Sequence, residues 1–381
     1  MKKIILYIIL SFMLQNCAVM IPFKDLPRPD GKFLVGTDVF VLKDVNREEI
    51  FTEATNDSRK IVVQVWYPSS EEGDSIYPYL DYPDIRIPYI AKRLGVKERL
   101  IEHINKVEAN AYYKSKPIQQ EFPVIIFSHG LGGNRTQNTA NIESLASNGY
   151  VVFAIEHTYD ANITIFNDST YIEFDSYLSE DVSIEEFYKI RIPQIKTRAD
   201  DISFMIDQIA QFKEQGFYIG EICDIDNIGI FGHSFGGGTT IVSSFLDSRI
   251  DACLNLDGWL EPITKNIINS GINIPFCYIG QEQKQWNGAP YNEELLLDFH
   301  ANNNNDSYII EIKKSHHFDF ADIPYLSRAT RLMGLSGKPG KTLTIDLNKT
   351  ITNFFNFYLK GQQTNWYDNL EKNYNTKINS K

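Results

Sequence analysis

A glycine-flanked serine is the feature of this sequence that most clearly indicates chemistry. Residues 232–236 read GHSFG, and they follow the apolar run 227–231 and open a segment of helical spacing. A serine in such a strand–turn–helix context is typical of a nucleophile elbow, whose strained turn leaves the hydroxyl exposed. Because a serine hydroxyl is a weak nucleophile at its own pKa, Ser234 requires a general base and an acid that orients the base.

Histidines downstream of Ser234 are the candidates for the base, since this architecture orders nucleophile, acid and histidine along the chain. His300 falls within a predicted helix, where a surface position is expected. His316 and His317 directly follow the predicted strand 308–313, at the carboxyl edge of the sheet where such folds expose functional side chains. The spacing alone leaves both open, because adjacent residues leave a loop in different directions.

The acid is expected at Asp257, which ends the predicted strand 252–256 and lies between the nucleophile and the histidines. Asp251 precedes that strand and is expected at the opposite edge of the sheet. Asp319 and Asp322 follow the histidines and break the expected order. An aspartate at position 257 would hold the imidazole tautomer and stabilise the imidazolium that forms when Ser234 attacks.

Backbone amides are expected to stabilise the negative charge that develops on a tetrahedral intermediate. One is the amide of Phe235, directly after the nucleophile. The other is expected from residues 129–133, read HGLGG, which follow the predicted strand 123–128. A phosphate cradle is the competing interpretation, but the loop lacks both GK[ST] and GxGxxG spacing. The sequence also has no HExxH or EF-hand pattern, so neither a cofactor nor a metal is expected.

Short apolar runs that alternate with segments of helical spacing predict the scaffold for these residues. Such a pattern is typical of an α/β fold with a mainly parallel sheet covered by helices on both faces. Two β-rich runs, 32–42 and 60–67, predict an antiparallel hairpin added at one edge. The later predicted strands are 123–128, 150–155, 227–231, 252–256, 274–280 and 308–313, and the helices are 137–148, 182–212, 236–246, 292–301 and 347–359.

Two segments fall outside this alternation. Residues 77–117 are rich in Tyr, Pro and Ile, with helical spacing over 90–107, and predict an insertion or lid within a catalytic domain spanning 31–361. Residues 362–381 are rich in Asn and Lys without apolar periodicity, and predict a solvated, functionally quiet tail.

Several aromatic and histidine residues have ordinary structural interpretations. His157 ends a predicted strand but precedes Ser234, so it is expected behind the site, and His233 is expected to support the elbow. Trp259, Trp286 and Tyr291 are candidates for an apolar acyl pocket.

Composition excludes several classes of protein. The chain has 381 residues, of which 43% are hydrophobic, so it can bury a large core. With 37 basic and 49 acidic residues its net charge is −12, and no basic run is interleaved with aromatics, so a nucleic-acid partner is not expected. The cysteines are widely spaced without a CxxC pair, which excludes a zinc site and a dense disulfide framework: Cys17, Cys223, Cys253 and Cys277.

The first residues predict export. Lys2 and Lys3 precede the apolar run 4–14, which is too short to span a bilayer and is typical of a signal peptide. Residues 14–17 read LQNC and resemble a bacterial lipoprotein cleavage box, so we expect removal of 1–16, lipidation of Cys17 and a tether over 17–30. The alternative is an ordinary signal peptide cut nearby. Both predict a protein of the cell envelope, membrane-anchored in the first case and periplasmic or secreted in the second.

Together these motifs resemble a known family, the plasma-type platelet-activating-factor acetylhydrolases or lipoprotein-associated phospholipases. The likeness covers about residues 31–361. It is carried by VWYP at 65–68, FSHGLG at 127–132, EH at 156–157, GHSFGG at 232–237, LDGW at 256–259, and His317 followed by FAD at 320–322. The resemblance implies an α/β-hydrolase fold, and calcium-independent hydrolysis of the short or oxidised acyl group at the middle position of a glycerophospholipid.

Residue by residue, the resemblance implies Ser234 as nucleophile, Asp257 as acid and His317 as base, because FAD follows His317 at the family's offset. It places the oxyanion amides on Leu131 and Phe235. It also implies a membrane or lipoprotein surface close to the substrate. The chain departs from the family at Gly258, where alanine is usual, and in the polar stretch 281–287.

The expected function is therefore that of an exported serine esterase acting through an acyl-enzyme on such phospholipids. One alternative is a broad carboxylesterase that cleaves acetylated sugars or other small esters. The other is a catalytically idle surface lipoprotein that binds a ligand or partner on this fold.

Overall fold

The core of the protein is a single sheet of eleven strands, ordered β13-β12-β11-β10-β9-β5-β6-β2-β1-β4-β3. The computed structural model describes residues 26–175, 178, 182–286, 291–327 and 330–381. The expected signal segment, Cys17 and most of the tether lie outside the described residues. The six central strands run parallel to one another and are β5 Phe122–Ser128, β6 Val151–Glu156, β9 Cys223–His233, β10 Ala252–Leu256, β11 Phe276–Gln281 and β12 Ser307–Ile312.

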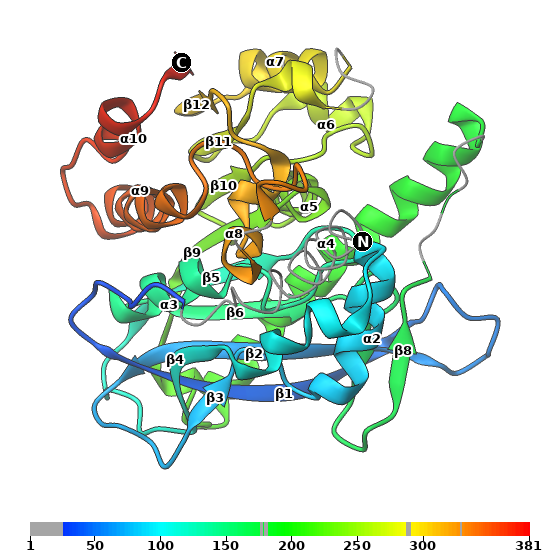
Figure 1. Ribbon diagram of the computed structural model, residues 1–381, viewed down its shortest axis with the longest axis vertical. Coiled ribbons are helices and arrows are strands. Elements are labelled where there is room, and N and C mark those ends of the chain that lie inside the picture. The colour runs from blue at the N-terminus through cyan, green and yellow to red at the C-terminus, as the bar shows by residue number, and fades with distance from the viewer. Residues whose placement is uncertain (1–25, 176–177, 179–181, 287–290, 328–329) are drawn as a thin grey trace, which may run out of the picture.

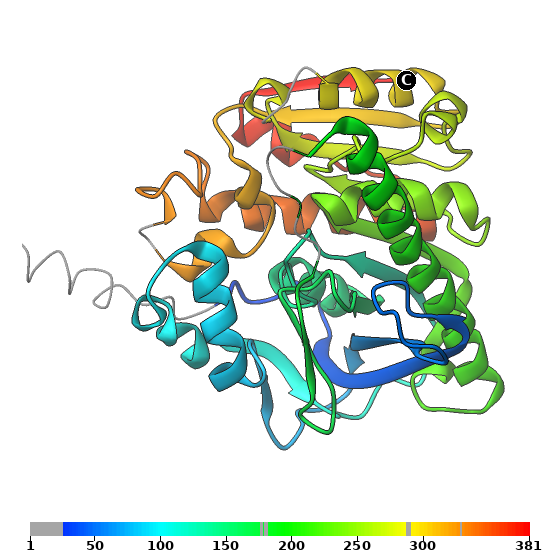
Figure 2. The same cartoon turned by 90° about the vertical axis from the view of Figure 1, so that its right-hand side faces the viewer.

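Helices cover both faces of this sheet, as Figures 1 and 2 show. The predicted α/β fold is thus confirmed. Strands buried on both faces read as continuous apolar runs, and Val124 to Phe127 of β5 are fully buried. On one face lie α3 Thr139–Ser147 and α9 Lys341–Lys360, and on the other α4 Ile184–Glu214, α5 Phe235–Leu246, α6 Lys265–Ser270 and α7 Tyr291–Asn302.

The antiparallel N-terminal hairpin is present, but it does not form the edge of the sheet. β1 Leu34–Glu48 pairs with β2 Ser58–Ser69, and β2 pairs with β6. Two strands of the predicted insertion extend the sheet beyond β1: β4 Glu108–Tyr113 and β3 Ile76–Pro78. The predicted hairpin is thus added at the β6 side of the parallel strands, and strands from the insertion, which were not predicted, satisfy the backbone groups that β1 would otherwise expose.

The rest of the insertion forms α2 Pro83–Leu94 and the short helices η1 Glu98–Leu100 and η2 Glu102–Lys106. The helix starts earlier than the predicted range 90–107. Pro83 suits a first helical position, where the missing N–H costs nothing. Gly95 ends the helix with φ 64°, a left-handed conformation that glycine adopts without strain.

The C-terminal segment is packed, which corrects the prediction of a solvated tail. α10 Asp368–Asn373 and β13 Thr376–Ser380 follow α9, and β13 pairs antiparallel with β12. Trp366 and Leu370 are buried, and the Trp366 ring packs edge-on against Phe354 and Tyr308. Trp366 and Leu370 are isolated apolar residues in a polar stretch, so the sequence shows no apolar periodicity there.

The described residues hold Cys223, Cys253 and Cys277 as buried free thiols. A small second sheet, β7 Ile163–Ile165 with β8 Tyr171–Glu173, lies beyond β6. Among the described helices, none combines the length and apolar character needed to cross a bilayer.

Replacing Trp366 by alanine tests the packed C-terminal segment. Removing a buried tryptophan leaves a cavity, so we expect the free energy of unfolding to fall by about 3 kcal/mol. Urea unfolding of Trp366→Ala beside the exposed-site control Gln363→Ala measures this. Equal stability of the two variants would show that the segment is only loosely attached.

Candidate active site

Ser234 lies at a sharp turn between β9, which ends at His233, and α5, which begins at Phe235. Its backbone has φ 58° and ψ −121°, a strained conformation for a residue with a side chain. Neighbouring glycines make the turn possible: a Cβ at Gly236 would lie 2.0 Å from the carbonyl oxygen of Ser128, and one at Gly232 would lie 2.4 Å from that of Gly236. The sequence thus forces Ser234 to the end of the strand, where it lines a cavity.

His317 and Asp257 meet at the carboxyl ends of neighbouring parallel strands. His317 begins η5 His317–Phe320 after β12, and its Nδ1 lies 2.6 Å from Oδ2 of Asp257, which directly follows β10. Since a carboxylate oxygen accepts, Nδ1 is the donor in this contact, and in the neutral tautomer that it selects Nε2 is the acceptor. His317 and Ser234 line the same cavity.

The Asp257 carboxylate is fully buried and held by three donors. Besides His317, its Oδ1 accepts hydrogen bonds from the Tyr278 hydroxyl and from the Gln281 backbone N–H, both at 2.9 Å. The Tyr278 hydroxyl accepts in turn from Gln283 Nε2 at 2.6 Å. Tyr278 was not among the residues singled out in the sequence, because its apolar strand reads only as core.

The other candidates for base and acid lie elsewhere. His316 Nδ1 lies 3.0 Å from the carbonyl oxygen of Gly334, and His300 Nδ1 lies 2.7 Å from the Ser307 hydroxyl. Asp251 accepts a hydrogen bond from the Ile228 N–H at the opposite end of β10. Geometry therefore favours His317 and Asp257, where spacing alone had left His316 open.

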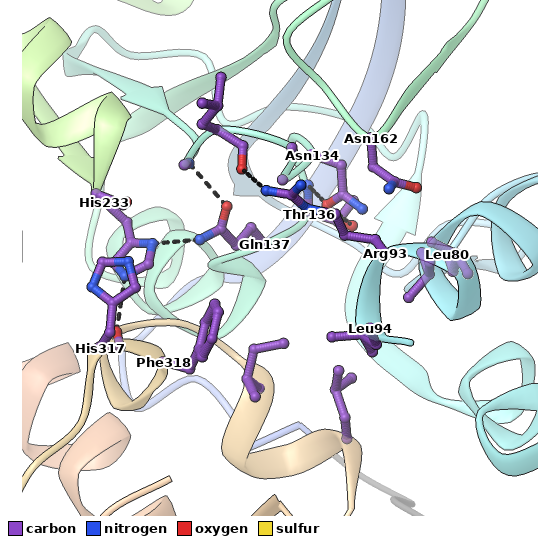
Figure 3. Close-up of a pocket in the computed structure, with 18 of the residues that line it drawn as sticks. Leu80, Arg93, Leu94, Asn134, Thr136, Gln137, Asn162, His233, His317 and Phe318 are labelled. Atoms are coloured by element: carbon purple, nitrogen blue, oxygen red, sulfur yellow. Dashed lines mark hydrogen bonds between the residues drawn. The ribbon is translucent and has the colours of Figure 1, made fainter. Parts of the chain in front are cut away.

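His233 supports the base from behind, as Figure 3 shows. Its ring stacks on that of His317 at 4.5 Å between centroids, and its Nε2 donates to the His317 carbonyl oxygen at 3.0 Å. Gln137 donates from Nε2 to His233 Nδ1 at 2.5 Å and accepts at Oε1 from the Gly130 N–H at 3.0 Å. Burial lowers the pKa of His233 well below its usual value, so the ring stays neutral. The sequence carried no signal for Gln137.

The loop after β5 offers backbone donors beside Ser234. Gly132 adopts φ 71° and donates to the Asp160 carbonyl oxygen at 2.8 Å, which turns the loop toward the cavity. Among the described residues, no acceptor engages the amide of Leu131. Phe235 opens α5, and the first amides of a helix have no partner within the helix. Both amides are thus available to a ligand oxygen.

A buried polar layer lies beneath this loop. Arg198 donates to the His129 carbonyl oxygen at 2.7 Å and to Asp160 Oδ2 at 2.6 Å. His157 lies between the Ser128 hydroxyl at 3.0 Å and Asp201 at 2.9 Å, so it is behind the site as expected. Burial and then the charge of Arg198 lower the pKa of His157 to about 4.

A second buried network fixes the wall of the cavity. Arg86 of α2 pairs with Asp81 at 2.7 Å and with Glu156 at 3.1 Å. Arg135 pairs with Glu156 at 2.7 Å and also contacts Asp81. Although burial opposes it, the charges of Arg135 and Arg86 lower the pKa of Asp81 to about 2. These four side chains tie α2 to β6, and of the four only Glu156 belongs to a motif noted in the sequence.

The cavity has a volume of about 400 Å³ and mostly apolar walls. The apolar side chains come from the insertion and from the segment around α8 Ile323–Leu326, and include Leu80, Ile90, Leu94, Ile104, Phe318, Ile323 and Leu326. Of the three aromatics proposed for an acyl pocket, only Trp259 lines it.

The other two aromatics have different contacts, which corrects that prediction. Trp286 packs edge-on against the His317 ring at 5.0 Å between centroids. The Tyr291 hydroxyl hydrogen bonds to that of Tyr188 at 3.0 Å. Over the described ranges, no group of three or more His, Cys, Asp or Glu residues is arranged to hold a metal ion.

Replacing Tyr278 by phenylalanine tests the support of Asp257. Losing one donor concentrates negative charge on the carboxylate facing His317, which favours the imidazolium. We expect the pH midpoint for labelling of Ser234 by a fluorophosphonate to rise, by up to about one unit. Labelling rates across pH measure this, with Tyr150→Phe as the control, because that hydroxyl donates to Asn356 and to no other described residue for which a bond is seen. An unchanged midpoint would show that Tyr278 merely fills space.

The chain is similar to known proteins named as an acetylhydrolase or an esterase. A dog protein named platelet-activating factor acetylhydrolase is 27% identical over 363 residues, covering 88% of this chain and 77% of the relative. A protein of Arthroderma benhamiae named "Probable 1-alkyl-2-acetylglycerophosphocholine esterase" is 26% identical over 170 residues, covering 45% of this chain and 38% of the relative.

A solved structure shows the fold. The ferulic acid esterase from Streptomyces cinnamoneus superposes with a TM-score of 0.74 at 22% identity, covering 91% of this chain and 96% of that one. The fold is therefore that of the α/β-hydrolases. The sequence model described as platelet-activating factor acetylhydrolase, isoform II, matches residues 19–378. Because this match spans nearly all of the described chain, the protein belongs to the platelet-activating factor acetylhydrolase, isoform II, family.

Proposed function

We propose that the protein is a serine esterase, a carboxylic ester hydrolase that cleaves the short or oxidised acyl ester at the sn-2 position of glycerophospholipids. The observation that carries this proposal is the contact of His317 with the buried Asp257, in the cavity that also holds the strained Ser234. Family membership supports the ester chemistry, and the names of the relatives support a 2-acetyl phospholipid as substrate.

In the proposed mechanism, His317 Nε2 removes the proton from Ser234 Oγ as that oxygen attacks the acyl carbonyl carbon. The amides of Leu131 and Phe235 donate to the oxyanion, a kind of contact that is typically worth about 10²- to 10³-fold in rate. Asp257 stabilises the imidazolium, which then protonates the departing glycerol oxygen. Water, activated by the same histidine, hydrolyses the acyl-enzyme and regenerates Ser234.

Every step of this mechanism uses a side chain or a backbone amide of the chain itself. We therefore propose that turnover is independent of calcium and of any cofactor. The largely apolar cavity walls suit the acyl and alkyl parts of a lipid, since such sites place a few polar groups among apolar ones.

We further propose that the protein is exported and anchored by lipidation of Cys17. The sequence Lys2–Cys17 supports this, as described above. The described chain begins beside the cavity: Leu26 is buried in one apolar cluster with Tyr79, Leu80 and Ile104, which line the cavity. Leu332 is 92% exposed and Met333 53% exposed, next to Arg331, a combination that suits contact with a lipid surface. An anchor would thus hold the cavity near the membrane that supplies its substrate.

Substituting Ser234 by alanine tests the nucleophile and the substrate together. We expect hydrolysis of a 2-acetyl phosphocholine in EDTA to fall by about 10⁶-fold, because the three residues act as one unit. Steady-state rates on that lipid, on its long-acyl counterpart and on p-nitrophenyl acetate measure this, with the exposed-site variant Ser248→Ala as control. Wild-type activity on p-nitrophenyl acetate alone would favour the general carboxylesterase instead.

Paired histidine variants test the base. His317→Gln should lose nearly all activity and nearly all labelling of Ser234 by a fluorophosphonate, because no other imidazole is aligned with Asp257 in the described site. His316→Gln is the matched control and should retain both, since its ring faces Gly334. Equal losses in the two variants would contradict the assignment, and a wild type that is never labelled would favour an idle scaffold.

A further inference from the structure

The cavity has a polar end as well as a catalytic one. Figure 3 shows Arg93, Asn134 and Asn162 gathered on the side away from His317. Arg93 belongs to the last turn of α2, and its Nη2 donates to the Leu131 carbonyl oxygen at 3.3 Å. A Cβ at Gly132 would lie 2.9 Å from Arg93 Nε. The guanidinium therefore lies directly over the loop expected to hold the substrate carbonyl.

A second arginine, Arg191, lies behind the cavity wall and forms no ion pair with a carboxylate among the described residues. Arg191 of α4 is only 5% exposed, and its guanidinium carbon lies 5.9 Å from the ring centroid of Trp259, which lines the cavity. Its Nη1 donates to Gln194 at 2.5 Å, but its Nε has no partner among the described residues. The nearby Asp160 carboxylate is instead paired with Arg198 at 2.6 Å.

This lack of a carboxylate distinguishes Arg191 from the other buried arginines. In the described chain, each of the others forms an ion pair with at least one carboxylate: Arg59, Arg86, Arg135 and Arg198. Burial, together with the charges of Arg198 and Arg93, lowers the pKa of Arg191 to about 10 despite the attraction of Asp160. A bound anion would relieve this excess of positive charge.

Asn162 adds an unsatisfied acceptor to the same end. It is 7% exposed and lines the cavity, and its Nδ2 donates to the Tyr89 carbonyl oxygen at 3.3 Å. Its Oδ1 is buried without a partner in the described residues. Because an unmet buried acceptor is costly, the position suits a ligand that brings an O–H or N–H donor.

We propose that Arg93, with the charge of Arg191 behind it and Asn162 beside it, forms a subsite for the headgroup phosphodiester of the substrate. This inference rests on the proposed function and specifies its substrate. A phosphodiester that carries an ethanolamine or glycerol group offers an anionic oxygen to Arg93, whose guanidinium also lies over the Phe174 ring, and a donor to Asn162 Oδ1. The terminal carboxylate of an oxidised acyl chain is also an anion, but when ionised it has no donor to offer.

The test compares Arg93→Gln with Lys92→Gln, which removes the same charge from the exposed neighbouring position on α2. Three substrates are compared: a 2-acetyl glycerophosphoethanolamine lipid, the matched 2-acetyl diglyceride without phosphate, and a phospholipid with an ω-carboxyacyl group. Each is used below the concentration at which it aggregates. We expect the ratio of kcat/KM for the first to that for the second to fall about tenfold in Arg93→Gln, mainly through KM, and to stay unchanged in Lys92→Gln.

An unchanged ratio in Arg93→Gln would overturn the proposal. A loss confined to the ω-carboxyacyl substrate would also overturn it, by assigning the subsite to the acyl chain. A wild type that cleaves no phospholipid would instead refute the proposed function. In that case competitive inhibition of p-nitrophenyl acetate hydrolysis by glycerophosphoethanolamine, present in the wild type and lost in Arg93→Gln, still tests the anion subsite separately.

Discussion

The site depends on one buried charge, the carboxylate of Asp257. An ionised group away from water is tolerated only when its lone pairs are satisfied, and here Tyr278, the Gln281 amide and His317 all donate to it. Two of these donors belong to β11 and hold the carboxylate in place, so that the third, His317, has one favourable orientation. The catalytic geometry is therefore a consequence of how the core satisfies a single anion.

The parallel strands of the sheet make this arrangement of Asp257 and His317 possible. β9, β10 and β12 end at the same edge of the sheet and deliver Ser234, Asp257 and His317 there, although 83 residues separate the first from the last in sequence. A different local feature places each residue. Ser234 lies in a turn packed by glycines, Asp257 adopts a φ of 45°, and His317 begins a short helix. The loop proposed to hold the oxyanion follows β5, next to β9, and Gln137 links it to His233 behind the elbow.

Much of this could be predicted from the sequence, because the central strands are apolar runs and the chemical residues directly follow them. The choice between His316 and His317 could not be made from spacing, since it depends on which ring turns toward Asp257. Tyr278, Gln137 and Arg86 were missed for another reason: each acts through a partner distant in sequence. Likewise, Trp366 and β13 are anchored by single contacts with elements far along the chain, and no local pattern records such contacts.

The ion pairs between α2 and β6 bear on how substrates are selected. Swinging α2 outward would separate Arg86 from Glu156 of β6 in a region shielded from water, and leaving a buried charge unpaired costs several kcal/mol. The cavity wall formed by α2 is thus rigid, and α2 does not move to open or close the cavity. Acyl chains would then be selected by whether they fit a preformed space, so discrimination should depend on their size and stiffness.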